Sequence, residues 1–191
     1  MDNELKEMIG KNEKVVYEGK PDKKCFIFEG IFNPLLPIAV LWGLFDSFFL
    51  MNFLNAGNPE VKDDGMVMFL VVFFALHLLP VWLYLGGILL IMKKFKNAYY
   101  VVTDKAVYLS EGALAKRYSM TLYTEVIHVD LHRGVFDRKF NVGDVVLTTK
   151  RVQRNSSGKE CNVTVSISDI AYYMDVYKVV KMLHEKFNTG K

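Results

Sequence analysis

The sequence has few cysteines, with only Cys25 and Cys161 among 191 residues. They show no Cys-x-x-Cys spacing, so we expect two reduced thiols and no disulfide scaffold. The charge balance is also modest, at +3, and 51% of the residues are apolar. This composition excludes a disordered or collagen-like chain, but it does not separate a soluble protein from a membrane protein.

Formal charge is almost absent from two long runs in the first half of the chain. Met66 to Met92 has none, and Leu35 to Leu54 has only Asp46. A helix rises about 1.5 Å per residue, so either run can cross a hydrocarbon core of roughly 30 Å. A polar segment, residues 1–30, precedes both runs, which excludes a cleaved signal peptide. We therefore predict a transmembrane helical hairpin within 31–92, with helices at about 35–54 and 66–92.

The lysines beside these runs predict the orientation of the hairpin. Three precede the first helix and three follow the second, whereas the connecting loop, residues 55–65, has one. The positive-inside rule then places both termini in the cytosol and the loop outside. We expect a multi-pass protein of the plasma (cytoplasmic) membrane. The flanking lysines are Lys20, Lys23, Lys24, Lys93, Lys94 and Lys96.

Two polar residues, Asp46 and His77, lie inside the apolar runs. In an antiparallel hairpin their depths differ by about 5 Å, close enough to pair if they face each other. Ionisable groups inside a membrane are costly and often functional. One interpretation is a small oligomeric transport or proton-coupled component. The alternative, which we favour, is that the pair only holds the hairpin together or that Asp46 is wetted from outside.

After Lys96 the sequence changes to short β-prone segments separated by turn residues. Such regular spacing predicts a small antiparallel barrel or sandwich. Ser168 and Asp169 then predict the cap of a C-terminal helix with one apolar stripe, which would close an open end of the barrel. Whether Glu13 to Gly19 adds a strand or stays free is open. The expected strands are 98–102, 106–109, 116–122, 126–131, 145–149 and 162–167.

A series of short motifs in this region resembles the bacterial pleckstrin-homology (PH-like) domain family. The motifs are Asn97 to Asp104 (NAYYVVTD), Val126 to Val129, Asn141 to Thr149 (NVGDVVLTT) and Ser168 to Ile170. The resemblance covers 97–187, and similar members often carry two membrane helices before the domain. It implies a mainly-β (α+β) PH-like barrel of antiparallel strands capped by a C-terminal helix. It implies no known catalytic residue and no defined ligand.

Motifs of common enzymes are missing from the sequence. There is no Walker-type loop, dinucleotide-binding glycine pattern or nucleophile elbow. His128 and His132 are four residues apart on an expected strand, without a nearby cysteine or paired carboxylate in the sequence, so we interpret them as surface residues. We expect no metal, no cofactor and no enzymatic activity. The absence of a basic helix also argues against nucleic acid as a partner.

One basic cluster, Lys150, Arg151, Arg154 and Lys159, lies in what we expect to be a loop between two strands. Anionic lipid head groups attract such residues by about 1 kcal/mol each near a membrane surface. The alternative, which we favour, is a solvated loop that follows the cytosolic charge bias. The sequence thus predicts a membrane-anchored, non-enzymatic PH-like binding or scaffold module at the cytosolic face. Its expected partners are the bilayer, anionic lipid head groups, a membrane protein or a second copy of the chain.

Overall fold

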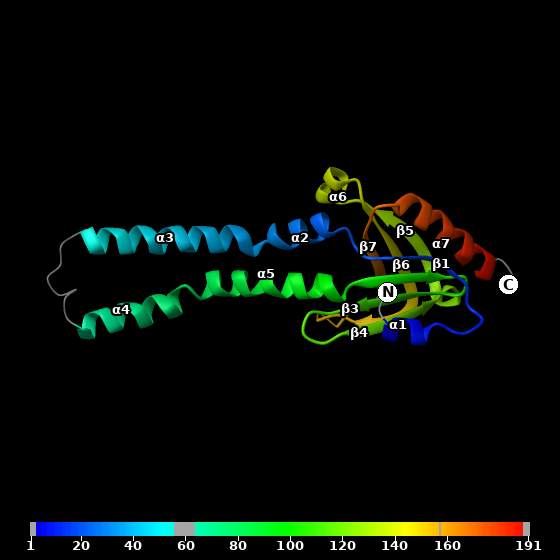
Figure 1. Cartoon of the computed structure of the whole chain (residues 1–191), viewed down its shortest axis with the longest axis horizontal. Coiled ribbons are helices and arrows are strands. Elements are labelled where there is room, and N and C mark those ends of the chain that lie inside the picture. The colour runs from blue at the N-terminus through cyan, green and yellow to red at the C-terminus, as the bar shows by residue number, and fades with distance from the viewer. Residues whose placement is uncertain (1–2, 56–63, 157, 189–191) are drawn as a thin grey trace. The chain divides into compact units, whose positions relative to one another are not determined.

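The computed structural model describes residues 3–55, 64–156 and 158–188. The chain divides into two compact units. One comprises Met1–Glu29 together with Met92–Lys191, and the other comprises Gly30–Ile91. We call the first the β domain and the second the helical segment (Figure 1). The expected external loop, residues 55–65, lies mostly outside the described residues.

The β domain consists of two antiparallel sheets. The first has the strand order β1-β2-β3-β4 and the second has the order β5-β6-β7. The strands of the first sheet are β1 (Val15–Gly19), β2 (Tyr99–Thr103), β3 (Ala106–Glu111) and β4 (Arg117–Leu122). Those of the second are β5 (Val126–His132), β6 (Gly143–Arg154) and β7 (Glu160–Ile170). A short 3-10 helix, η2 (Tyr123–Glu125), joins them, and α6 (Val135–Phe140) lies between β5 and β6.

The main core lies between the two sheets and the C-terminal helix α7 (Tyr173–Asn188). Alternate residues of β2 and β3 point into it, including Val102 and Val107, and β6 contributes Val145. Helix α7 adds Val180, whose side chain is completely buried. Because α7 has one apolar stripe and one polar face, it covers the space between the sheets with the stripe inward. The expected barrel with a capping C-terminal helix is consistent with this arrangement.

The N-terminal residues belong to the same domain. Strand β1 pairs antiparallel with β2, and Gly19 lies opposite Tyr100. Helix α1 (Asn3–Met8) places Leu5 against the outer face of the first sheet, in a second cluster with Val101 and Tyr108. The open question about residues 13–19 is therefore answered, because Val15–Gly19 form an edge strand. The β domain thus includes N-terminal residues in addition to the expected 97–187.

Two local expectations were wrong. Ser168 and Asp169 do not cap the last helix, because β7 continues to Ile170 and α7 begins at Tyr173. Asp169 instead has a left-handed backbone, with φ of 56°. Strands β6 and β7 also extend beyond the expected 145–149 and 162–167, so part of the expected basic loop is strand.

The helical segment contains α3 (Leu35–Asn55), α4 (Asp64–His77) and the start of α5 (Leu79–Asn97). Helix α2 (Lys23–Ile31) leads into it from the β domain. The second apolar run, expected as one helix over 66–92, is divided next to Pro80, and α4 and α5 meet at a bend of 54°. Proline lacks the N–H that an unbroken helix needs, which accounts for a break at this position.

Candidate functional site

The basic residues lie on a two-stranded extension of the second sheet, which we call the arm (residues 150–162). The first part of β6 alternates buried and half-buried side chains, but every described residue from Lys150 to Arg154 is exposed. The pairing continues as far as Arg154 opposite Glu160, so the arm remains a hydrogen-bonded ribbon. A ribbon exposed on both faces buries little apolar surface of its own. It is therefore available for contact with a ligand or partner.

Two acidic residues reduce the positive charge of the arm. Arg151 Nη2 lies 2.6 Å from Glu125 Oε2, and Arg154 Nη2 lies 3.6 Å from Glu160 Oε1. Lys150 Nζ donates to the carbonyl of Thr124 at 2.7 Å. The local net charge is thus lower than the four basic side chains alone indicate. Exposed pairs of this kind contribute little to stability, so they can open when a stronger anion approaches.

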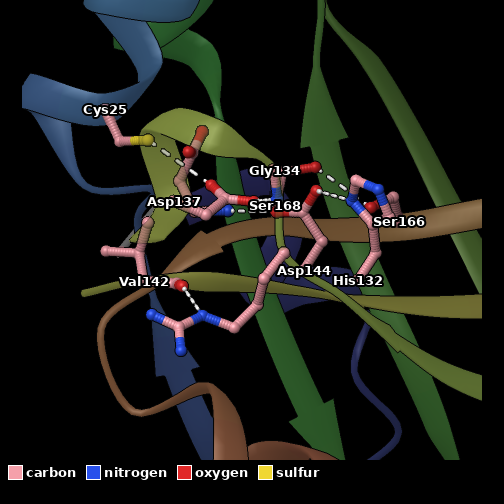
Figure 2. Close-up of polar contacts among 10 residues, drawn as sticks. Cys25, His132, Gly134, Asp137, Val142, Asp144, Ser166 and Ser168 are labelled. Atoms are coloured by element: carbon pink, nitrogen blue, oxygen red, sulfur yellow. Dashed lines mark hydrogen bonds and ion pairs between the residues drawn. The ribbon is translucent and has the colours of Figure 1, made fainter. Parts of the chain in front are cut away.

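A second polar site surrounds Asp137 in α6 (Figure 2). Its Oδ2 accepts a hydrogen bond from the backbone N–H of Gly134 at 2.6 Å, which closes the first turn of α6. Its Oδ1 faces the thiol of Cys25, and the sulfur–oxygen distance is 3.4 Å. Cys25 is positioned by α2, where its N–H donates to the capping carboxylate of Asp22 at 2.9 Å. Both Cys25 and Asp137 are buried.

The end of β7 brings further carboxylates to this site. The N–H of Asp169 donates to Asp144 Oδ1 at 2.8 Å, and the carbonyl of Asp169 accepts from the N–H of Asp22 at 2.8 Å. Asp144 Oδ2 also lies 3.8 Å from Nδ1 of His132, whose ring points toward it in Figure 2. Asp169 is itself 2% exposed. Residues from α2, α6, β5, β6 and β7 therefore meet within one small region.

Burial dominates the electrostatics of this polar site. It raises the pKa of Asp169 to about 7, and the nearby carboxylates of Glu29, Asp144 and Asp137 add to the effect. Burial also raises the pKa of Asp144, and partial desolvation and then the nearby Asp137 carboxylate raise the pKa of Glu29, although its side chain reaches solvent. For the Cys25 thiol, burial and then the Asp169 side chain raise the pKa far above its ordinary value. In this site burial therefore favours the protonated forms of these groups over the charged forms.

The sequence analysis missed this site and treated His132 as a surface residue without acidic neighbours. The side chain of His132 is indeed exposed, but Asp144 and Asp137 lie beside it. Cys25 and Asp169 are 144 positions apart in the chain, so no spacing motif connects them. Only the tertiary fold brings them together, since α2 is attached to the end of β7 by the bond from Asp22 N–H to the Asp169 carbonyl.

A small cavity of about 100 Å³ lies between the two sheets. Tyr100 and Leu109 of the first sheet and Ser166 and Ser168 of the second contribute to its walls, as does Lys94. It has room for a few water molecules but not for a cofactor.

In the helical segment, His77 Nδ1 lies 2.8 Å from Asp46 Oδ1 and 3.1 Å from Oδ2. Trp42 packs on the same ring, with centroids 5.3 Å apart, and its indole N–H donates to the carbonyl of His77 at 2.8 Å. Asp46 is 4% exposed. The two polar side chains thus satisfy each other within the segment, as a clamp between helices would require.

Helix α3 is the one helix among the described residues that by itself is long and apolar enough to cross a membrane. Its mean hydropathy over Leu35–Phe53 is 1.6. Helices α4 and α5 would provide a second crossing only as a single bent span. Side chains of α3 such as Leu41, 72% exposed, and Phe48, 71% exposed, face away from the rest of the described segment. This exposure is unlike that of a core helix in a soluble protein.

Two antiparallel sheets closed by a C-terminal amphipathic helix are typical of a PH-like fold. The family model described as bacterial PH domain matches residues 36–181. The chain belongs to this family. Comparison with curated proteins and with solved structures found no match.

Proposed function

We propose that this protein is a membrane-anchored, non-enzymatic PH-like module that holds its β domain at the cytosolic face. The arm is its binding element. The membership of the chain in the bacterial PH domain family supports the binding role, since PH domains are typically non-catalytic binding modules.

The observation that carries the anchoring part is the pairing of Gly19 with Tyr100. The whole apolar segment lies between these two residues in the chain, yet they are neighbours in one sheet. Both ends of the segment must therefore lie on the same side of any membrane that it enters. If α3 crosses the bilayer, the chain has to return, and α4 with α5 is the only described segment apolar enough to do so. The bend of 54° is then a kink within the returning span.

The lysines at the ends of the segment support a cytosolic β domain. They flank the two apolar runs on the side of the β domain, where the positive-inside rule expects them. Residues 93–191 also carry a net charge of +7, which suits the anionic inner surface of a plasma membrane. Anionic lipid head groups are the ligand that this charge favours, and a membrane-protein partner is the alternative.

The Asp46–His77 contact is the one observation that favours a transport or proton-coupled role. The two groups satisfy each other at 2.8 Å, and Trp42 covers the ring. A closed pair of this kind suits a clamp between two helices better than an ion path. We therefore assign the pair to holding the hairpin.

Purification from native membranes in mild detergent tests the binding role. We expect the wild-type chain to retain a lipid or protein partner that is lost when Lys150, Arg151, Arg154 and Lys159 are all changed to Gln. Washing the membranes at alkaline pH tests anchoring in the same preparation, because an integral protein stays in the pellet. Release of the protein into the wash contradicts membrane anchoring. Equal recovery of partners with the wild type and the four-Gln variant contradicts the binding role of the arm.

A further inference from the structure

Four potential metal ligands from three elements meet at the end of β7. They are Cys25 and Glu29 of α2, Asp137 of α6 and Asp169 of β7, and one donor atom from each lies within 4.8 Å of all the others. Cys25, Asp137 and Asp169 are buried, whereas Glu29 is exposed at the rim. The group thus has three interior donors and one donor that borders on solvent.

One oxygen in this group lacks a partner. Oδ1 of Asp169 is buried and accepts no hydrogen bond from any described residue. Native proteins rarely leave a buried polar atom unsatisfied, because the loss of water is not compensated. The backbone on both sides of this carboxylate is tied down, through its N–H to Asp144 and through its carbonyl to Asp22. The oxygen is therefore held in a buried position that a ligand would complete.

The two buried carboxylates of this group, Asp137 and Asp169, have no basic partner among the described lysines and arginines. Arg133 is close in the chain, but its Nε donates to the carbonyl of Val142 and its guanidinium lies 4.6 Å from the centre of the Tyr173 ring. A bound divalent cation would stabilise such a cluster of acidic groups, because it supplies the positive charge that no described lysine or arginine provides.

We propose that Cys25, Glu29, Asp137 and Asp169 bind one Zn²⁺ ion. This inference is independent of the proposed binding function. Zinc accepts sulfur and carboxylate oxygen together in a four-coordinate site, whereas Mg²⁺ and Ca²⁺ prefer oxygen alone. Ideal zinc bond lengths put a sulfur and an oxygen donor about 3.5 to 3.7 Å apart in a tetrahedron. The Cys25 sulfur and Asp137 Oδ1, 3.4 Å apart, are close to this separation.

A second group nearby, His132, Asp137 and Asp144, is less suited to hold the ion. Its donor atoms also lie within 4.8 Å of one another. However, Oδ2 of Asp137 already accepts from Gly134, Oδ1 of Asp144 accepts from Asp169, and His132 is exposed. We therefore place the ion on the Cys25 side of Asp137, next to the unpaired oxygen.

The role of the ion would be structural. When the metal–sulfur bond forms, the Cys25 thiol releases its proton to solvent. The hydrogen bond from Cys25 to Asp137 is then replaced by bonds from the sulfur and from an Asp137 oxygen to the same metal ion. The ion would then join α2 to α6 and to the end of β7 within the β domain. All four positions would be occupied by protein, as is usual for structural zinc.

The test uses the full chain in detergent micelles, stripped of metal with a chelator. Zn²⁺ is added in competition with a chromophoric chelator, and bound metal is counted by elemental analysis. We expect one ion per chain. Replacing Zn²⁺ by Co²⁺ should give a thiolate-to-cobalt charge-transfer band in the near ultraviolet, which reports the sulfur ligand without any substitution. Absence of this band from the wild-type chain overturns the proposal.

Cys25→Ser and Asp169→Asn should each weaken Zn²⁺ binding by at least about tenfold. Circular dichroism of each variant verifies that it remains folded. Cys161→Ser and His132→Asn are the matched controls, because they change an exposed thiol and an imidazole outside the proposed set. Both controls should bind Zn²⁺ as the wild type does. If a control loses binding, or if folded Cys25→Ser and Asp169→Asn retain it, the assignment is wrong.

Discussion

Gly19 and Tyr100 lie opposite each other in neighbouring strands, although the whole helical segment separates them in the chain. Tyr100 is 3% exposed and stacks on Tyr17, with ring centroids 5.9 Å apart. Its hydroxyl donates to the carbonyl of Lys20 at 3.4 Å. The strand before the helical segment is thus paired with the strand after it, and both belong to the β domain. A fragment that contains the whole β domain must therefore include residues from both sides of the helical segment.

A β domain without its helices should fold only if the N-terminal residues are kept. We expect residues 1–29 joined to 92–191 by a flexible glycine–serine linker to give a cooperative thermal transition. Residues 97–187 alone lack β1 and the Leu5 contact, and should melt at a markedly lower temperature or not cooperatively. Thermal unfolding followed by circular dichroism compares the two. An equally stable short fragment would show that β1 is dispensable.

The membrane topology predicts where introduced cysteines react. In a Cys161→Ser background, a cysteine at Asn58 should react with an impermeant thiol reagent in intact cells. A cysteine at Ser156, in the arm, should react only after the cells are opened. The reason is the lysine asymmetry around the apolar runs. Labelling of position 156 in intact cells would place the β domain outside.

Changing Val180 to Asp should destabilise the β domain by several kcal/mol, because the carboxylate would enter the core without a partner. Met182 lies on the exposed face of the same helix, at 60% exposure, so Met182→Asp is the matched control. Its effect should stay within about 0.5 kcal/mol. Chemical denaturation of the linker-joined domain measures both. Similar losses from the two substitutions would contradict the observed orientation of α7.

The arm predicts weak, salt-sensitive binding to anionic vesicles. With Glu125 and Glu160 beside the four basic residues, the local net charge is near +2, which corresponds to about 2 kcal/mol of attraction. Changing all four residues to Gln should abolish sedimentation of the linker-joined domain with such vesicles. Salt should weaken the wild-type interaction.

The control for the arm removes the same amount of charge elsewhere on the β domain. Its four substitutions to Gln are at Lys105, Lys178, Lys181 and Lys186. This variant should retain most of the binding. Negligible binding by the wild-type domain would exclude the lipid and leave a protein partner as the ligand of the arm.

The raised pKa of Asp169 predicts that the metal-free chain loses stability as pH rises. Its ordinary value is 3.8 and burial raises it to about 7. Between these values the folded state binds more protons than the unfolded state, so the free energy of unfolding falls with increasing pH, by on the order of a few kcal/mol. Glu29 and Asp144 face the same region, and their raised pKa values act in the same direction.

Asp169→Asn should flatten this pH dependence, since the amide does not titrate and asparagine tolerates the left-handed backbone at this position. Thermal melts in the presence of a chelator, at several pH values between 3.8 and 7, measure the difference. Parallel curves for the wild type and the variant would show that Asp169 is not the titrating group.

The sequence by itself determined the features that depend on local composition. Two long runs with almost no charge predict apolar helices, because length and hydropathy decide whether a segment can enter a membrane. Alternating segments such as Val145 to Thr149, followed by an apolar stripe through Val180, predict strands and a capping helix for the same local reason. The family resemblance rested on these segments, and the family match to residues 36–181 confirmed it.

Only the tertiary structure decided what depends on residues far apart in the chain. In the structure, β1 pairs with β2 although the helical segment lies between them in the chain. Strand β7 continues through Asp169, which the capping pattern had predicted to cap the last helix. The tertiary structure also brought Cys25 next to Asp137 and left an oxygen of Asp169 unpaired. Local patterns report propensity and periodicity, whereas these contacts join residues 25 or more positions apart, which no local signal encodes.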